Sequence, residues 1–461
     1  VRNLHTPILK WTKIKNRERH SMQMDMGFSG WFVRFSTELR YLEQIKTGMG
    51  RIGLIVLGIF LLLQSCESKE KSLMLGDWWG GMDVSETETL PFNFSISKDN
   101  DGSYIMEMYN ADEVVVVDEF ELEGDVIRIQ MPIFEGYIQG TFNETSIQGS
   151  FIKESLNRVV PFHALYGKRD RFEVTEDPAT NVSGVWETHF NIGQDNQYPG
   201  KGIFTQTGNK VTGTFRTHSG DYRYLEGAIS GTTVKLSAFD GAHVFLFTAE
   251  VGDSTMQGTF YSGNHFVSSF QGKRNDAFEL TDADELTFLK EGYDQFNFSF
   301  EDTEGKMVSL SDERFRNKPV LVQIMGTWCP NCLDETRFYA DFLKKNPTLD
   351  MEFVALAFEY AKTKEKALEG IARLRKRVGV DYPILLAQYG TSSKQKANEK
   401  LPMLNHVISY PTTIYIDKQG DVNKIHTGFN GPATGEKYEL FKKEFAETIQ
   451  ELTEAEEIAV K

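Results

Sequence analysis

Two cysteines three positions apart form the pattern with the clearest chemistry in this chain. Cys329 and Cys332 follow an apolar run at residues 320–325 and precede a segment with helical spacing. A strand that ends in Cys-x-x-Cys at a helix start places the first sulfur where unpaired N–H groups and the helix dipole stabilise a thiolate. The thiolate attacks disulfides, and the second cysteine, one turn later, can resolve the mixed disulfide. The pattern therefore predicts a redox-active Cys329–Cys332 disulfide.

The chain contains one further cysteine, Cys66, and nine histidines. Three cysteines cannot form a disulfide framework, and no second Cys-x-x-Cys completes a four-thiolate zinc site. The histidines of the region before residue 280 show no ligand spacing with carboxylates or thiols. We therefore expect no metal and no other cofactor.

Cys66 ends a segment typical of a bacterial leader sequence. The apolar stretch 52–63 has twelve residues, which suits a signal-peptide core and is shorter than the roughly 20 residues of a membrane span. Leu63-Gln64-Ser65-Cys66 resembles a lipobox, which predicts Cys66 as the lipidated first residue of the mature protein. The alternative is a signal anchor with an incidental cysteine. A first residue of Val and an internal Met49 predict translation from Met49 or another nearby Met, with a long n-region as the alternative. In either case the leader, residues 1–65, is left out of the fold.

The chain from Cys66 onward is too long for a single core and predicts two or three domains. The net charge of the whole sequence, -16, argues against nucleic acid as a partner. Between residues 73 and 273, short alternating runs separated by Gly, Asn and Asp predict antiparallel strands. Beyond about residue 281 the pattern changes to alternating strands and helices, so we place a boundary near residues 275–279.

The β-rich region shows an internal duplication. Gly76-Asp77-Trp78 recurs as Gly184-Val185-Trp186, residues 147–151 recur as 256–260, and residues 165–169 recur as 270–274, at offsets of 105 to 109. A constant period indicates repeated structural units. We predict an all-β tandem repeat of small barrels or sandwiches at 66–175 and 176–280. Trp78, Trp79 and Trp186 either line a ligand site at a barrel mouth or plug the barrel ends.

The remaining domain, 285–461, is predicted as α/β. Strands are expected at 352–358, 382–386 and 412–416, with amphipathic helices between them. In total the fold class is multidomain, with the β repeats followed by this C-terminal domain.

Residues 290–450 resemble the TlpA/ResA-like thiol–disulfide reductases of the thioredoxin superfamily. The resemblance is carried by residues 326–332, by Ser409-Tyr410-Pro411-Thr412-Thr413 and by residues 416–420. It implies a thioredoxin-like fold with Cys329 as the exposed nucleophile and Cys332 as the buried resolving thiol. Pro411 matches the family's cis-proline, and Tyr410 before it would present backbone groups to the substrate. Trp328 would shield the sulfurs and contact the substrate.

Glu335, three residues after Cys332, lies where this family often keeps a carboxylate that takes the proton of the resolving thiol. The alternative is a solvated glutamate favoured by the helix dipole, and Asp334 is expected to be its solvated neighbour. The Pro-Asn pair between the cysteines departs from the family pattern, so the redox potential does not carry over. The turn-rich run 426–435 is expected beside the cis-proline, either shaping a partner groove or as a plain surface connection.

These features predict a lipid-anchored thiol–disulfide oxidoreductase at the periplasmic face of a bacterial membrane, inner or outer. Its partners would be disulfide-containing protein substrates and a membrane thiol-transfer protein as electron donor, because the periplasm is oxidising overall. One alternative is a thiol peroxidase of the same superfamily. Another is a ligand-binding lipoprotein in which the β repeats carry the main role.

Overall fold

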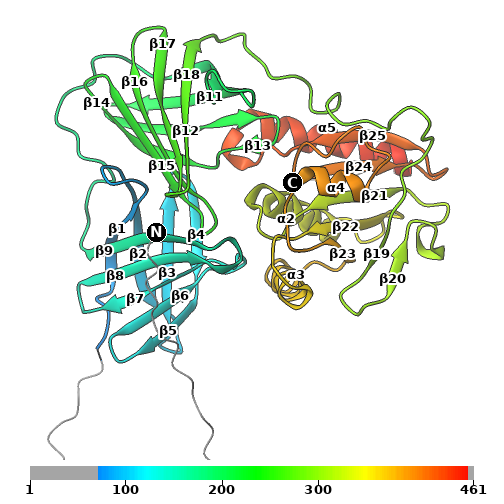
Figure 1. Cartoon of the computed structure of the whole chain (residues 1–461), viewed down its shortest axis with the longest axis horizontal. Helices are drawn as coiled ribbons and strands as arrows, with labels where there is room; N and C mark the ends of the chain where they lie inside the picture. The colour runs from blue at the N-terminus through cyan, green and yellow to red at the C-terminus, as the bar shows by residue number, and fades with distance from the viewer. Residues whose placement is uncertain (1–70, 455–461) are drawn as a thin grey trace, which may run out of the picture. The chain divides into compact units, whose positions relative to one another are not determined.

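The computed structural model describes residues 71–454, which form three β-sheets and four α-helices within that range (Figure 1). The predicted lipidation site, Cys66, and the leader lie outside the described residues. Within 71–454, none of the helices has the length and apolar character needed to cross a membrane.

Repeat 1 is an antiparallel sheet of nine strands in which neighbours in sequence pair, except β4 and β5, which form the two edges, and β9 returns to β1. Alternating burial along β3 is typical of a sheet with one face packed on a core. The strands are β1 (Gly76–Asp83), β2 (Thr89–Lys98), β3 (Tyr104–Asn110), β4 (Glu113–Val117), β5 (Glu119–Glu123), β6 (Val126–Gln130), β7 (Tyr137–Phe142), β8 (Ser146–Lys153) and β9 (Arg158–Tyr166).

Repeat 2 has the same strand order but closes into a barrel. Here β12 pairs with both β11 and β14, and β10 pairs with β18, so every barrel strand has two neighbours. The strands are β10 (Gly184–Phe190), β11 (Tyr198–Thr207), β12 (Lys210–Thr217), β13 (Gly220–Asp221), β14 (Leu225–Ser230), β15 (Thr233–Phe239), β16 (Val244–Val251), β17 (Thr255–Ser262) and β18 (Phe266–Arg274).

Equivalent tryptophans support the proposed duplication. Trp78 and Trp186 are fully buried, and each donates its Nε1–H to the carbonyl four residues earlier, at 3.0 and 2.9 Å. Both therefore fill the core, whereas Trp79 is half-buried against His163. One sequence match was wrong. Trp78 lies opposite Tyr166 and Trp186 opposite Arg274, an offset of 108, so residues 165–169 are not the counterpart of 270–274.

The C-terminal domain, predicted at 285–461 and called the redox domain below after its predicted Cys329–Cys332 pair, has a mixed seven-stranded sheet in the order β20-β19-β23-β22-β21-β24-β25. Only the β21–β22 and β22–β23 pairs are parallel, so the predicted α/β class holds in part. The elements are β19 (Ser299–Glu301), β20 (Met307–Ser309), β21 (Val320–Met325), α2 (Pro330–Lys345), β22 (Glu352–Phe358), α3 (Lys364–Val378), β23 (Ile384–Gln388), α4 (Lys394–Lys400), β24 (Thr412–Ile416), β25 (Val422–Thr427) and α5 (Glu436–Thr453).

Local signals fix the helices of this domain. The Thr363 side chain caps α3 by accepting from the Lys366 N–H, and Gly379 ends it at φ 75°. Helices α2 and α5 pack together through Phe338 and Phe445, whose ring centroids lie 4.9 Å apart. Strand β21 is buried along its whole length, so the residues that follow it are held on a rigid support.

Candidate functional site: a dithiol at the start of α2

Cys329 lies at the turn between β21 and α2, where it is the N-cap residue of the helix. Its Sγ accepts a hydrogen bond from the Cys332 N–H at 3.2 Å, and Pro330 occupies the first helical turn. Backbone N–H groups and the helix dipole favour negative charge at such a position. Both cysteines are free of a disulfide, so Cys329 can lose its proton and form the thiolate that attacks a disulfide.

Three further predicted residues lie at Cys329, namely its neighbour Trp328 and, from a distant part of the chain, Tyr410 and Pro411. The Tyr410–Pro411 peptide bond is cis, as expected, and the Tyr410 carbonyl accepts from the Cys329 thiol at 3.3 Å. Trp328 packs edge-on against Tyr410, with ring centroids 5.5 Å apart, and donates Nε1–H to the Phe358 carbonyl at 2.9 Å. The structure therefore brings Trp328, Cys329, Tyr410 and Pro411 together.

Cys332 and Glu335 are both completely buried below Cys329. Gln323 donates to a Glu335 carboxylate oxygen at 2.8 Å and Thr413 donates to the other at 2.9 Å. Burial raises the pKa of Glu335 to about 7 and, with the hydrogen bond to Cys329, raises the pKa of the Cys332 thiol. A carboxyl that titrates near neutral pH can take and return a proton, and the solvated alternative for Glu335 was wrong.

The expectation that Cys329 is exposed was also wrong, because its residue exposure is 7%. Cys329 is covered by the hairpin of repeat 2 that joins β12 to β13. This hairpin, residues 217–221, packs against the residues around Cys329, and we call it the cap hairpin. Asn331, between the two cysteines, donates to the Asp221 carbonyl at 3.1 Å. Ser409, next to Tyr410, donates to the Ser219 carbonyl at 3.0 Å.

The run 426–435 lies beside the cis-proline, as predicted, since the Gly428 N–H donates to the Pro411 carbonyl at 2.9 Å. The cap hairpin covers this run as well. The Gly431 N–H donates to the Asp221 carboxylate at 2.7 Å, and Arg216 donates to Asn430 at 2.9 Å. Repeat 2 therefore packs on the run for which a partner groove and a plain surface connection were the two alternatives.

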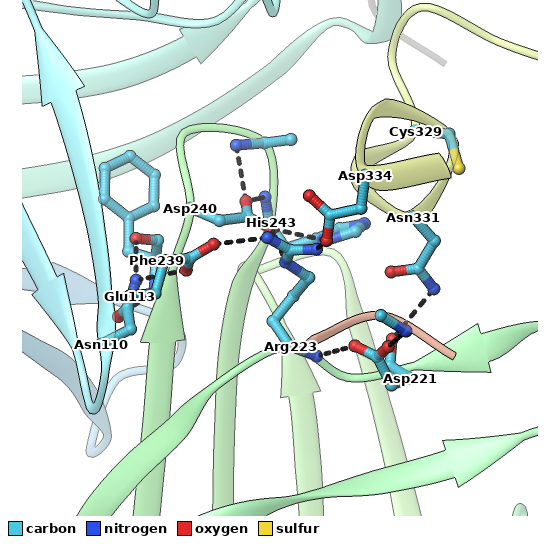
Figure 2. Close-up of polar contacts among 12 residues, drawn as sticks. Asn110, Glu113, Asp221, Arg223, Phe239, Asp240, His243, Cys329, Asn331 and Asp334 are labelled. Atoms are coloured by element: carbon cyan, nitrogen blue, oxygen red, sulfur yellow. Dashed lines mark hydrogen bonds and ion pairs between the residues drawn. The ribbon is translucent and has the colours of Figure 1, made fainter. Parts of the chain in front are cut away.

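A buried arginine holds this arrangement in place (Figure 2). Arg223 forms ion pairs with Glu113 of repeat 1, Asp240 of repeat 2 and Asp334 of α2. Burial opposes its charge, but the surrounding carboxylates, Asp334 foremost, raise the pKa of Arg223 well above its usual range. Asp334 was expected to be solvated, yet its side chain is 11% exposed, because Arg223 covers it.

A second buried carboxyl lies behind Trp328 and was missed by sequence reasoning. Glu359 is 3% exposed and accepts from the Thr327 N–H at 2.8 Å and the Thr327 hydroxyl at 2.7 Å. Burial raises the pKa of Glu359 to about 7. The available signal was a single acidic residue directly after the apolar strand 352–358. The contacts of Asp221 and Arg223 had no such signal, because they depend on the packing of distant segments.

Comparison with known proteins identifies relatives of the redox domain. The Redoxin family profile matches residues 290–439. Thiol-disulfide oxidoreductase ResA of Bacillus subtilis (strain 168) is 30% identical over 140 residues, covering 30% of this chain and 69% of that protein. Thioredoxin-like protein YneN of the same organism is 29% identical over 140 residues, covering 30% and 73%. A solved thiol-disulfide oxidoreductase from Bacteroides fragilis NCTC 9343 is 22% identical with a TM-score of 0.24, covering 32% of this chain and 99% of that chain.

Proposed function

This chain belongs, through its C-terminal part, to the ResA-like thiol–disulfide oxidoreductases, and we propose that it reduces protein disulfides through Cys329 and Cys332. The observation that carries the proposal is the position of the Cys329 sulfur. It lies 3.2 Å from the Cys332 N–H and 3.3 Å from the Tyr410 carbonyl, beside the cis-proline. A substrate disulfide placed against Tyr410 would meet the nucleophile directly.

In the proposed cycle the Cys329 thiolate attacks one sulfur of the substrate disulfide. A mixed disulfide forms, and the first substrate thiolate leaves and takes up a proton. Cys332 then loses its proton and attacks the Cys329 sulfur, which releases the second substrate thiol. Two electrons pass to the substrate, and the Cys329–Cys332 disulfide remains.

Glu335 is proposed as the base for the second step. The pKa of the buried Cys332 thiol is raised, so Cys332 needs an acceptor for its proton before it can attack. The Glu335 carboxyl, with a pKa of about 7, stands one helical turn further along α2. Gln323 bridges the two, since its amide lies 2.8 Å from Glu335 and 3.4 Å from the Cys332 carbonyl.

We propose that the enzyme acts at the periplasmic face of a bacterial membrane, held by a lipid on Cys66. The lipobox-like Leu63-Gln64-Ser65-Cys66 after the apolar stretch 52–63 supports this anchor. In an oxidising compartment the disulfide form would accumulate, so a membrane thiol-transfer protein is proposed as electron donor. The cap hairpin must move aside before a protein substrate can reach Cys329.

The first test is the equilibrium reduction potential of the Cys329–Cys332 pair in the full chain, titrated with dithiothreitol. A value near about -270 mV supports a reductase, whereas one near about -120 mV indicates a dithiol oxidase and overturns the proposed direction. The Cys329→Ala variant is the control and must show no titration. If the two thiols form no internal disulfide, the proposed cycle is wrong.

A further inference from the structure

A cavity of about 580 Å³ lies beside the redox site, with walls from all three parts of the structure. Repeat 1 contributes Lys153 and Arg158, repeat 2 contributes an aromatic wall, and the redox domain contributes Trp328 and Tyr360. The volume is within the range of sites that hold small organic molecules. Trp328, the residue before Cys329, is thus part of the cavity wall.

The lining of this cavity has an unusual charge for this protein. Among its nineteen lining residues none is Asp or Glu, although the whole chain has a net charge of -16. Four lining side chains are basic types, namely Lys153, Arg158, His243 and His265. His243 is paired with Asp240, and His265, whose pKa is lowered to about 4, is neutral near pH 7, so the positive charge comes from Lys153 and Arg158. The cavity is therefore a positive site in an acidic molecule, and it should attract an anion.

Lys153 is the centre of this positive charge. It is 8% exposed, and its Nζ donates to the Ala242 carbonyl at 3.2 Å and lies 5.8 Å from the Tyr360 ring centroid. Within residues 71–454 no ion pair is formed by Lys153 or by Arg158. Glu135 and Asp240 act on Lys153 through space without pairing with it. A buried ammonium without an acidic partner is costly unless a bound anion supplies one.

The electrostatics of neighbouring groups agree with this geometry. Burial, and then the charge of Arg158, lower the pKa of Lys153 to about 8. Burial followed by the charges of Arg158 and Lys153 lowers the pKa of His265 to about 4. After burial, the charge of Arg158 is the next largest cause of both shifts, so Arg158 lies within electrostatic range of Lys153 and of His265.

The aromatic residues in the lining favour a ligand with a flat, apolar body. Tyr222, Phe245 and Phe260 form an edge-to-face cluster, with ring centroids 5.1 to 5.3 Å apart. On the other side, Tyr360 is buried, and its hydroxyl has no hydrogen-bond partner among the described residues. Aromatic walls with one free phenol and two cations suit an aromatic ring that carries an acidic group.

We propose that this cavity binds a small organic anion, a carboxylate or sulfonate on an aromatic or apolar body, with Lys153 and Arg158 holding the acidic group. The ligand would lie against Trp328 and so share a wall with the dithiol site. This binding function is separate from disulfide reduction, and it does not require the proposed redox direction to be correct.

The test compares two fluorescent probes of nearly the same shape on the purified full chain. 8-Anilino-1-naphthalenesulfonate carries a negative charge, and N-phenyl-1-naphthylamine is its neutral parent. The variant Lys153→Met removes the charge and keeps the length of the side chain, whereas Lys306→Met changes an exposed lysine of the redox domain and serves as control. Because a charge-assisted hydrogen bond is lost, the Kd of the anionic probe should rise about tenfold in Lys153→Met.

The neutral probe should bind wild type and Lys153→Met equally, and Lys306→Met should leave both probes unaffected. The variant Arg158→Gln, at a half-buried position, should also raise the Kd of the anionic probe. The proposal is overturned if wild type does not bind the anionic probe, or if Lys153→Met binds it as tightly as wild type does. It is also overturned if Lys153→Met binds both probes more weakly by the same factor. The last result would show a loss of apolar packing instead of a lost anion contact.

Discussion

Replacing Asp334 by asparagine is expected to open the cap hairpin and expose Cys329 to large thiol reagents. Asp334 is the ion-pair partner that α2 offers to Arg223, and both side chains are almost fully buried, at 11% and 6% exposure. Arg223 is anchored to the repeats by Glu113 and Asp240, so its bond to Asp334 fastens repeat 2 to the helix that carries the dithiol.

The expected size of the effect follows from burial. Losing one partner of a buried, hydrogen-bonded charge pair costs about 2–5 kcal/mol. Asparagine still accepts a hydrogen bond and Arg223 keeps two carboxylates, so the lower end, about 2 kcal/mol, applies to the contact with α2. This changes an opening equilibrium by about 30-fold. Where opening and closing are fast, a labelling rate follows the open population and should rise by the same factor.

The assay measures labelling of Cys329 in the reduced full chain by a polyethylene-glycol maleimide, with iodoacetamide as the small reference reagent. Peptide mass spectrometry separates Cys329 from Cys66. The matched control is Asp341→Asn, which makes the same change on the same helix at a position that is 64% exposed. Our account of the cap hairpin fails if Asp334→Asn labels within twofold of wild type, or if Asp341→Asn accelerates labelling as much.

Three other changes test separate parts of the site. In Gly220→Ala the new Cβ would clash with the Asn331 amide nitrogen, so this variant should also speed bulky labelling, whereas Gly167→Ala, at φ 106° against 122° for Gly220 and with open space around the new Cβ, should not. Glu335→Gln should slow the attack of Cys332 by about 10²-fold, so that trapped mixed disulfide accumulates in quenched samples; unchanged resolution would exclude the proton role. The folded-state pKa of Glu359, about 7 against an ordinary 4.5, makes the folded state bind its proton more tightly, so this carboxyl should remove about 2 kcal/mol of stability between pH 5 and 8. Urea unfolding of Glu359→Gln should therefore show a smaller loss over that range than wild type, and equal losses would contradict the assignment.

The redox domain was predictable because its signals are local. A strand, a Cys-x-x-Cys and a helix are adjacent in sequence, and the cis-proline motif is a short run before another strand. These signals also placed Glu335 correctly near the resolving thiol. The exposure of Cys329 was predicted wrongly, because exposure depends on what other segments cover the site. No local pattern around Cys329 indicates that Asn331 bonds to Asp221, which lies 110 residues earlier.

The class of the β repeats was predictable from alternation, but their sheet closure was not. Repeat 2 closes because β14 pairs directly with β12. In repeat 1 the corresponding β5 pairs with β6 alone, and β4 is the neighbour of β3 on that side. The open sheet of repeat 1 and the closed sheet of repeat 2 have the same strand order and nearly the same spacing. Whether the sheet closes therefore depends on which strands pair, and the periodicity of the sequence does not report this pairing.

The residues of repeat 2 that cover the dithiol come from the place where the two copies differ most. The register of β3 and β12 corresponds at an offset of 107, which matches Asp221 and Arg223 with Val114 and Val116 of β4. Those valines are 50% and 49% exposed, whereas Asp221 and Arg223 are 7% and 5% exposed. In repeat 2 the strand stops after Asp221, and Arg223 adopts a left-handed φ of 64°.

This local change frees the Arg223 side chain to reach Asp334, and it turns the edge of a sheet into a cover for the redox site. The motifs that the two copies share do not reveal this segment, because it contains none of them. The same reasoning explains why repeat 1 contributes Glu113 to the Arg223 cluster. Glu113 begins β4, which is the strand of repeat 1 that corresponds to β13, so this edge of repeat 1 supplies the negative charge that pairs with Arg223. Arg223→Val should therefore weaken the cover over Cys329 and leave the closed barrel of repeat 2 intact, since a valine occupies the matching position in repeat 1.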